Sequence, residues 1–455
     1  MEQAVRLSVR PALPSLSESK PARLIVVAIL YFMQGIPWGL STVGISAWLA
    51  ANGATPVEVG VFIGTAVLPW SLKLVNGLLM DRFTFKPMGR RRVWIIAAQA
   101  MMAIVLLAMA IDAPTVGQIG LLAAYCFALN LCATFNDVAI DGMVVDLVPD
   151  EERTMVNGMM FASQTLGIAA ASFVAGQLLM SGDISSTALT FAAFVAIVSS
   201  VVVIFRERPG ERLLPWSKGT ASRECEERQH SAWLPIIAGI FRSIASPLTV
   251  LFLLATFLNQ AVWAFIDAAS PTLTIQMLGW GSDQYSSFAA MVGLVAAIAA
   301  GVLSPLIVRI TGLRKSIIIL FVLLGASAAI GGATFDSWED DRIFMTIFMI
   351  QYVVGLLLSI LLIVWAMRIC NPAVAASQFA LFMAIPNLGR SLMSGNSGWL
   401  VESGGYAVTY YAVAAITLVA LVLCLLAKVG KSEAVPIPAL PIKSSITKEK
   451  KYEDD

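Results

Sequence analysis

The sequence predicts an all-α polytopic membrane protein with twelve transmembrane helices arranged in two halves of six. Of the 455 residues, 58% are hydrophobic and only 13% are charged, and the mean hydropathy is +0.81. Soluble domains have roughly 45–50% apolar and about 25% charged residues. Apolar runs of about eighteen or more residues recur along the whole chain, and each is long enough to cross a bilayer.

Twelve apolar runs divide the chain. They cover approximately 23–50, 57–80, 93–111, 116–145, 154–180, 187–205, 247–277, 284–309, 315–335, 342–369, 373–400 and 405–427. We therefore expect an N-terminal segment at 1–22, a six-helix bundle at 23–205, a linker at 206–246, a second six-helix bundle at 247–427 and a tail at 428–455. Within the linker, 233–244 could form a short interfacial helix.

The distribution of positive charge predicts the orientation in the membrane. Of the 30 Lys and Arg residues, 27 lie on the side of the N-terminus and one, Arg342, lies in a loop on the other side. Loops rich in Lys and Arg face the cytoplasm. We therefore expect both termini and the linker to be cytoplasmic.

Several classes of protein and site are excluded by composition. The net charge is +1 and the basic residues are spread over short loops, so no nucleic-acid partner is expected. The five cysteines are scattered without CxxC spacing, and His230 is the single histidine. We therefore expect no disulfide framework, no metal, no cofactor and no histidine-based catalytic centre. Residues 1–20 do not form a cleavable signal peptide.

Two basic residues, Lys73 and Arg390, fall inside predicted spans, one in each half. Ionisable groups in spans are costly and usually functional. Arg390 lies about 18 Å from each end of its helix, so it must pair with an acid or face water. Lys73 is about 12 Å of helix from Asp81 and could partly reach the interface. Pairing of Lys73 with Asp137 or with Asp267 is equally available.

The fourth span contains two acids in FNDVAIDG (135–142). Asn130, Thr134, Asp137 and Asp141 follow helical spacing and share one face. Two carboxylates four residues apart repel when both are charged, so one of them could carry a proton. The alternative is that Asp141 marks the cytoplasmic end of the span.

Polar residues also line other predicted spans. Gln260, Trp263 and Asp267 share a face of the seventh span, and an aromatic plane beside an acid suits a ligand with rings or sugars. Asn387 lies near the second cation on the eleventh span. Gln34 belongs to a polar stripe on the first span, whose alternative role is interhelical hydrogen bonding.

The loop after the second span has a recurring pattern, GLLMDRFTFKPMGRRRVW (77–94). Its expected conformational residues are Gly77, Asp81, Arg82, Gly89, Arg90 and Arg91. Gly77 permits close helix approach, Asp81 can accept hydrogen bonds from a helix N-terminus, and the arginines anchor the loop at the lipid headgroups. The alternative is plain positive-inside anchoring. A weak copy at 301–317 suggests related halves with a site between them.

Several stretches together resemble one family of membrane carriers. They are YFMQGIPWGL (31–40), LPWSLKLVNGLLMD (68–81), FKPMGRRRVWIIAAQ (85–99), FNDVAIDG (135–142), ASQTLG (162–167) and SQFALFMAIPNLGRSLMSGNSGWLVESGGY (377–406). The chain resembles the peptide–acetyl-coenzyme A transporter family of the major facilitator superfamily, which includes AmpG-type muropeptide permeases. The resemblance implies the major facilitator fold and alternating access. Gly389 and Arg390 match the AmpG-like version of the eleventh span.

We therefore expect a proton-coupled secondary active transporter that imports a bulky, polar, anionic solute. By family analogy the solute is an anhydromuropeptide. The expected substrate-binding residues are Lys73, Arg390, Gln34, Asn130, Gln260, Trp263 and Asn387. The expected proton-coupling residues are Asp137, Asp141 and Asp267. The expected partners are the solute, protons and the lipid bilayer, and the expected functional unit is a monomer.

Other functions remain as alternatives. A siderophore or another conjugate could replace the muropeptide. An acetyl-CoA-type ligand is disfavoured because two intramembrane cations are few for its phosphate charges. An integral-membrane enzyme acting on lipid-linked sugars would need acids, histidines or metal ligands gathered at one membrane face, whereas here the acids are dispersed over both halves. No GxxxxGK[ST] loop occurs, which disfavours an ATP-driven pump.

Overall fold

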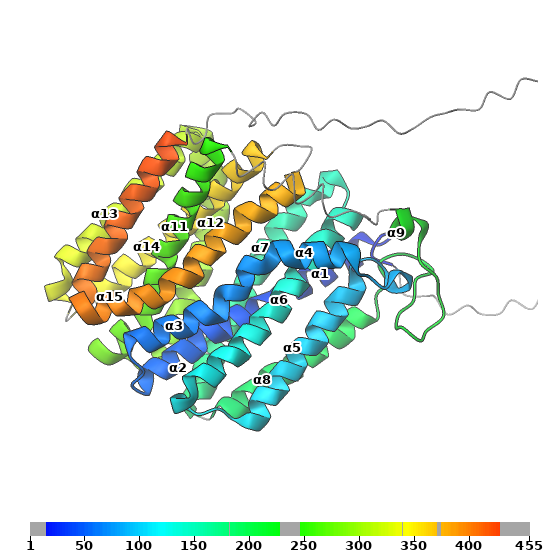
Figure 1. Ribbon diagram of the computed structural model, residues 1–455, viewed down its shortest axis with the longest axis horizontal. Helices are drawn as coiled ribbons and strands as arrows, with labels where there is room; N and C mark the ends of the chain where they lie inside the picture. The colour runs from blue at the N-terminus through cyan, green and yellow to red at the C-terminus, as the bar shows by residue number, and fades with distance from the viewer. Residues whose placement is uncertain (1–14, 182, 228–245, 339, 371–374, 428–455) are drawn as a thin grey trace, which may run out of the picture.

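The computed structural model describes residues 15–181, 183–227, 246–338, 340–370 and 375–427, and this part of the chain consists of helices joined by loops, with no strand (Figure 1). The interfacial helix expected at 233–244 lies outside the described residues, as do the tail at 428–455 and most of the N-terminal segment. Eleven helices of the described part are long and apolar enough to cross a membrane.

The helices of the first half alternate in direction. They are α1 (Lys20–Gly39), a π-helical segment (Leu40–Ile45), α2 (Ser46–Ala51), α3 (Pro56–Val67), a 3-10 segment (Leu68–Leu72), α4 (Lys73–Arg82), α5 (Arg92–Asp112), α6 (Ile119–Leu147), α7 (Asp150–Ser181) and α8 (Ile184–Val203). α1 to α2 form one span and α3 to α4 form the next. The first half therefore crosses the membrane six times.

The second half follows the ordered part of the linker. Its elements are α9 (Arg223–Glu227) in the linker, α11 (Pro247–Thr272), a π-helical segment (Leu273–Met277), α12 (Ser282–Thr311), α13 (Leu313–Ala333), α14 (Asp341–Ile369) and α15 (Ala375–Leu426). The backbone of α15 breaks at Gly405, which has φ +80° and ψ 173°. The 52 residues of α15 would span about 78 Å if straight, more than twice a bilayer core. The break divides α15 into two crossings, so the part of the chain that the structure describes crosses twelve times.

Prolines account for the irregular points in the spans. Pro69 lies in the 3-10 segment just before Lys73, which begins α4. Proline removes a backbone donor and clashes with the preceding turn, so the helix tightens at this point. α11 continues through Pro271 as an α-helix and becomes π-helical from Leu273. Each irregular segment is buried only in part: Trp70, Leu273 and Thr274 are buried, whereas Leu72 and Met277 are 38% and 51% exposed.

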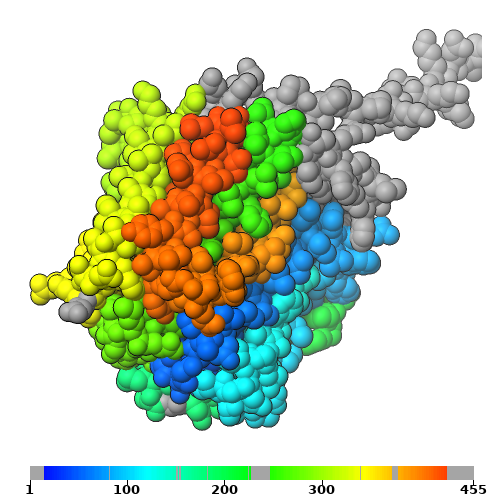
Figure 2. Space-filling view, turned by 60° about the vertical axis from the view of Figure 1, so that its left-hand side comes forward, coloured from blue at the N-terminus to red at the C-terminus, as the bar shows by residue number. Residues whose placement is uncertain are grey.

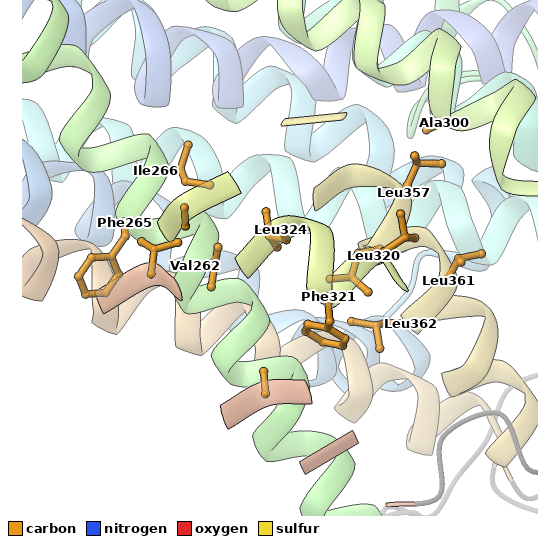
Figure 3. Close-up of a cluster of buried hydrophobic side chains, with 14 of the residues drawn as sticks. Val262, Phe265, Ile266, Ala300, Leu320, Phe321, Leu324, Leu357, Leu361 and Leu362 are labelled. Carbon is orange, nitrogen blue, oxygen red and sulfur yellow. The ribbon is translucent and has the colours of Figure 1, made fainter. Parts of the chain in front are cut away.

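Each half has its own apolar core. In the second half, Phe265, Phe321 and Leu362 are buried in a cluster contributed by α11 to α15 (Figure 3). The first half packs α1 against α7 through small residues. A Cβ atom at Gly35 would overlap the backbone of Gln164. Small residues such as this glycine allow two membrane helices to approach this closely.

The two halves meet along α3 and α15, which run side by side (Figure 1). We call the end of the bundle beside the linker residues 204–227 the linker end and the opposite end the far end. Ser391 Oγ donates to the Gly64 carbonyl at 2.6 Å, and a Cβ atom at Gly60 would overlap the Ser394 carbonyl. Gln276 Nε2 donates to the Ala50 carbonyl at 2.9 Å. These contacts close the bundle in its far half.

Candidate functional site

Lys73 is paired with Asp137 of α6. Its ammonium lies 2.5 Å from Asp137 Oδ2, and the Gln34 amide of α1 donates to the other carboxylate oxygen. The Asp137 side chain is only 4% exposed. Of the two acids that the sequence left open as partners, the structure selects Asp137. Pro69 ends the preceding turn so that Lys73 begins a new helix and points toward α6.

Asp141 has a different environment from Asp137. The Tyr31 hydroxyl of α1 donates to its carboxylate, and Asp141 is exposed while Asp137 is buried. A carboxylate that faced lipid would be strongly disfavoured, so Asp141 faces the space between helices. The two acids predicted to share one helix face therefore hold different partners.

Arg390 is the second paired cation. Its guanidinium contacts the Asp267 carboxylate of α11 and lies 3.5 Å from Gln260 Oε1. The guanidinium also lies 5.4 Å from the ring centre of Trp263. The stripe of residues recognised on the seventh span thus surrounds Arg390.

Two tryptophans of the first half lie between the cations. Lys73 Nζ is 4.9 Å from the ring centre of Trp70, Trp70 and Trp38 meet edge to face at 5.4 Å, and the Arg390 guanidinium is 4.7 Å from the Trp38 ring centre. The sequence analysis did not single out either indole. The signal was the dipeptide Pro-Trp, which occurs within two spans, at 37–38 and 69–70, and once more in the linker, at 215–216.

Asn130, a predicted substrate contact, is enclosed within the first half. It is fully buried; its Oδ1 accepts from Trp70 Nε1 at 2.9 Å, and its Nδ2 donates to Ser41 Oγ at 3.1 Å. Both ends of the amide are therefore used within the first half. Asn130 positions Trp70, and the structure does not bring it to the surface between the cations.

A cavity of about 140 Å³ lies beside Arg390 in the second half. Its walls come from α11, α14 and α15, at Phe252, Thr256, Asn259, Gln260, Ser359, Leu362, Ile363, Phe382, Met383, Pro386 and Asn387. Asn387 also donates to the Trp70 carbonyl at 3.3 Å. This predicted site residue therefore lines the cavity and contacts the opposite half at once.

The loop between α4 and α5 contacts the linker. The Glu207 carboxylate accepts the backbone N–H groups of Arg90 at 3.0 Å, Arg91 at 2.8 Å and Arg92. Arg90 and Arg91 are each 8% exposed and lie 3.4 Å and 3.8 Å from Asp146. These two arginines therefore contact an acid of α6 within the protein, and their anchoring at lipid headgroups stays a prediction.

The remaining loop residues are less informative. Gly89 has φ +97°, and a Cβ atom there would overlap the Glu207 carboxyl, so glycine is required. A Cβ atom at Gly77 would lie an ordinary 3.7 Å from Val138, so close approach does not require glycine there. Arg82 is exposed at the end of α4, and the side chain of Asp81 lies outside the described part of the structure.

Two linker carboxylates have raised pKa values. Burial raises the pKa of Glu207, against the three backbone N–H groups that favour its charged form. Burial, followed by the nearby charge of Glu207, raises the pKa of Glu211 to about 7. In the described part of the chain, no three His, Cys, Asp or Glu side chains gather to hold a metal ion.

Comparison with known proteins points to one superfamily. The family model described as Major Facilitator Superfamily matches residues 27–394 and 252–450. The chain is 24% identical to the anhydromuropeptide permease of Escherichia coli over 417 residues, which is 88% of this chain and 79% of the relative. It is 27% identical to a folate-biopterin transporter of Synechocystis over 391 residues, covering 80% and 72% of the two chains.

Solved structures show the same fold. A POT family transporter in complex with a thioalcohol-conjugated peptide superposes with a TM-score of 0.68 at 14% identity, covering 89% of this chain and 95% of the other. The nucleoside transporter NupG superposes with a TM-score of 0.65 at 15% identity, covering 89% and 98%.

Proposed function

Because the chain belongs to the major facilitator superfamily and is a transporter, not an enzyme, we propose that it imports a bulky polar anion together with protons. The first candidate for the solute is an anhydromuropeptide, by similarity to the permease of that name. The observation that carries the proposal is the pair of partly buried cations, Lys73 and Arg390, one in each half and linked through two indoles. The proposed setting is a bacterial inner membrane, with a monomer whose termini are cytoplasmic.

Charge balance explains why such a carrier needs protons. Lys73 with Asp137 and Arg390 with Asp267 are two neutral pairs. An anion that entered beside them would bring an uncompensated charge into a low-dielectric site. Protonation of Asp137 or Asp267 frees its cation for the anion and leaves the total charge unchanged. Coupling of one proton to each negative charge of the solute follows.

The proton route is proposed to begin at Asp141. This exposed carboxylate lies one helical turn from the buried Asp137, on the same helix. The Tyr31 hydroxyl keeps its proton: it donates to the charged Asp141 carboxylate and can turn to accept a hydrogen bond from Asp141 once that carboxyl is protonated. Asp141 therefore connects the space between the helices with the ion pair of Lys73.

A folate-like anion is the second candidate. One relative is named a folate-biopterin transporter, and the site places the rings of Trp38, Trp70 and Trp263 around the two cations. Aromatic planes beside fixed cations suit a solute that combines flat rings with carboxylates. A siderophore or another conjugate has the same combination.

Uptake by proteoliposomes tests the proposal. Labelled anhydromuropeptide and internal pH are followed together in vesicles that are acidic outside and negative inside, for the wild type and for Arg390→Ala, with exposed Arg342→Ala as the control. We expect gradient-dependent uptake with matching proton entry, at least roughly tenfold slower in Arg390→Ala because a charge-assisted contact of about 1.5–3 kcal/mol is lost. Equal uptake by Arg390→Ala would remove Arg390 from the site, and preferential uptake of folate would select the second candidate.

A further inference from the structure

We propose that the cavity between α11, α14 and α15 is a subsite for an uncharged amide of the solute, an N-acyl or peptide group whose N–H is accepted by Asn259. This inference rests on the proposed function, since it assumes that the anionic end of the same solute is bound by Arg390. It adds a chemical requirement that the cations alone do not impose. The solute must carry an amide N–H near its negative charge.

The lining of the cavity excludes a charged occupant. No charged side chain belongs to the lining, whose polar groups are two hydroxyls and three carboxamides on an otherwise apolar wall. A charged group would lose its hydration without gaining a counter-charge. An apolar cavity with a few converging polar groups is the usual form of a site for a neutral part of a ligand.

Asn259 supplies an acceptor without a partner. The residue is only 2% exposed, and its Oδ1 has no hydrogen-bond partner in the structure. Its Nδ2 is directed at Ser359 Oγ at 3.5 Å, and the same hydroxyl accepts from Trp263 Nε1 at 3.2 Å. In this orientation of the carboxamide, Oδ1 has no partner. A buried acceptor left unpaired is costly, so a ligand N–H at this point would be favoured.

The size of the cavity fits a short amide-bearing segment. A water-sized group takes about 30 Å³ when several are packed together, so the cavity of 140 Å³ has room for roughly five such groups. An acetamido group or one peptide unit with its α-carbon fits within this number. The apolar wall, which includes Phe252 and Phe382, would contact the methyl or methylene groups of such a segment.

The subsite shares a wall with the cation. Gln260 lines the cavity and its Oε1 lies 3.5 Å from Arg390 Nη1. Asn387 lines the cavity and reaches the Trp70 carbonyl of the first half. A solute with its carboxylate on Arg390 would therefore place an amide only a few bonds away into the cavity. Because Asn387 contacts the first half, a solute bound at Arg390 and in the cavity at the same time would also affect the contact between the halves.

The test uses matched amides and esters as probes. The probes are N-acetyl derivatives of glycine, β-alanine and γ-aminobutyrate, and the O-acetyl esters of the corresponding hydroxy acids. Each pair has the same charge and nearly the same shape, and only the amide has an N–H. Binding is read as protection of Ile363→Cys, a residue of the cavity wall, from N-ethylmaleimide, in a background in which the partly buried Cys132 and Cys370 are replaced by alanine.

We expect at least one amide to protect the full-length protein at a concentration at least roughly fivefold lower than its ester, by analogy with other sites built for a hydrogen bond. Asn259→Leu should abolish that preference, whereas the exposed control Asn396→Leu should keep it. Equal protection by amide and ester in all three pairs overturns the proposal, as does an unchanged preference in Asn259→Leu.

Arg390→Ala separates this proposal from the transport function. It should weaken protection by both members of a pair while keeping their ratio, because the anion contact and the amide contact are different. If Arg390→Ala leaves both probes equally effective, the anion anchor is wrong and the amide subsite stands. Failure of anhydromuropeptide uptake likewise leaves the probe result unaffected.

Discussion

The guanidinium of Arg390, in the second half of the chain, lies 4.7 Å from the ring centre of Trp38, in the first half. The same guanidinium contacts Asp267 of its own half. Arg390 therefore has one partner that stays with it when the halves rotate and one that does not. In a carrier that opens alternately at its two ends, the contact with Trp38 is one that the transport cycle must change.

Trp38→Leu should weaken solute uptake. The loss of a desolvated cation–π contact of about 1–2 kcal/mol corresponds to a roughly five- to thirtyfold lower rate at low solute concentration. Trp38→Phe should lose less, because phenylalanine keeps a π face, and the exposed linker substitution Trp216→Leu is the control. Uptake rates in proteoliposomes check the order. If Trp38→Phe and Trp38→Leu behave alike, shape alone accounts for the role of Trp38.

Removing one member of the Arg390–Asp267 pair should destabilise the protein more than removing both. An unpaired buried charge costs roughly 3–5 kcal/mol, whereas a neutral replacement of the pair costs much less. We expect Asp267→Asn and Arg390→Gln to lower the thermal midpoint of the detergent-solubilised protein, and the double variant to recover part of the loss. Additive losses would show that the two side chains are independently hydrated.

Gly398→Val should prevent closure of the far end. A Cβ atom at Gly398 would overlap the backbone of Pro56. This overlap can be relieved only if the two halves move apart at the far end. We expect uptake to fall at least roughly tenfold. An impermeant maleimide should then reach Ser394→Cys, a position that is fully buried here. Gly293→Val is the matched control, since a Cβ atom at Gly293 meets nothing within 4 Å; equal effects of the two valines would refute this reading.

Glu207→Ala should release the loop at the start of α5. Three backbone N–H groups lose their acceptor, and each lost charge-assisted hydrogen bond is worth about 1.5–3 kcal/mol. Hydrogen exchange at Arg90, Arg91 and Arg92 should therefore become at least roughly tenfold faster. The exposed Glu226→Ala is the control. Unchanged exchange at these amides would mean that α5 begins equally well without the linker.

The ordered linker should lose stability as the pH rises toward 7. The pKa of Glu211 is raised from its usual 4.5 to about 7 in the folded protein, so the folded state binds a proton that the unfolded linker has already released. Its stability therefore falls as the pH rises from about 4.5 to about 7 and is constant above that.

Protection factors for the amides of Arg212 and Thr220, which donate to the Pro87 and Gly210 carbonyls, follow this change, because they divide out the intrinsic pH dependence of exchange. Glu211→Gln should flatten the pH profile. A profile in the wild type that rises with pH, or one that Glu211→Gln leaves unaltered, contradicts the assignment.

The sequence by itself predicted the number of crossings and the charged side chains that the structure pairs within the spans. The number of spans is the number of apolar runs that are long enough to cross a bilayer. The length of a run is a local property of the sequence, and the thickness of the bilayer sets the length that is needed. Five charged residues stood out because a charge within an apolar run is costly wherever the helix packs. They are the cations Lys73 and Arg390 and the acids Asp137, Asp141 and Asp267. For the same reason the stripe of Gln260, Trp263 and Asp267 could be identified before its contact with Arg390 was known.

Only the tertiary structure decided which of these residues meet. Lys73 could reach either of two acids, and the choice of Asp137 depends on how α4 lies against α6 after the 3-10 turn at Pro69. Asn130 shares a helix face with Asp137, yet packing against α1 and Trp70 encloses it. Residues that lie 60 to 130 positions apart in the chain meet only when the helices have a particular order and rotation. The periodicity of a single helix does not determine either of these.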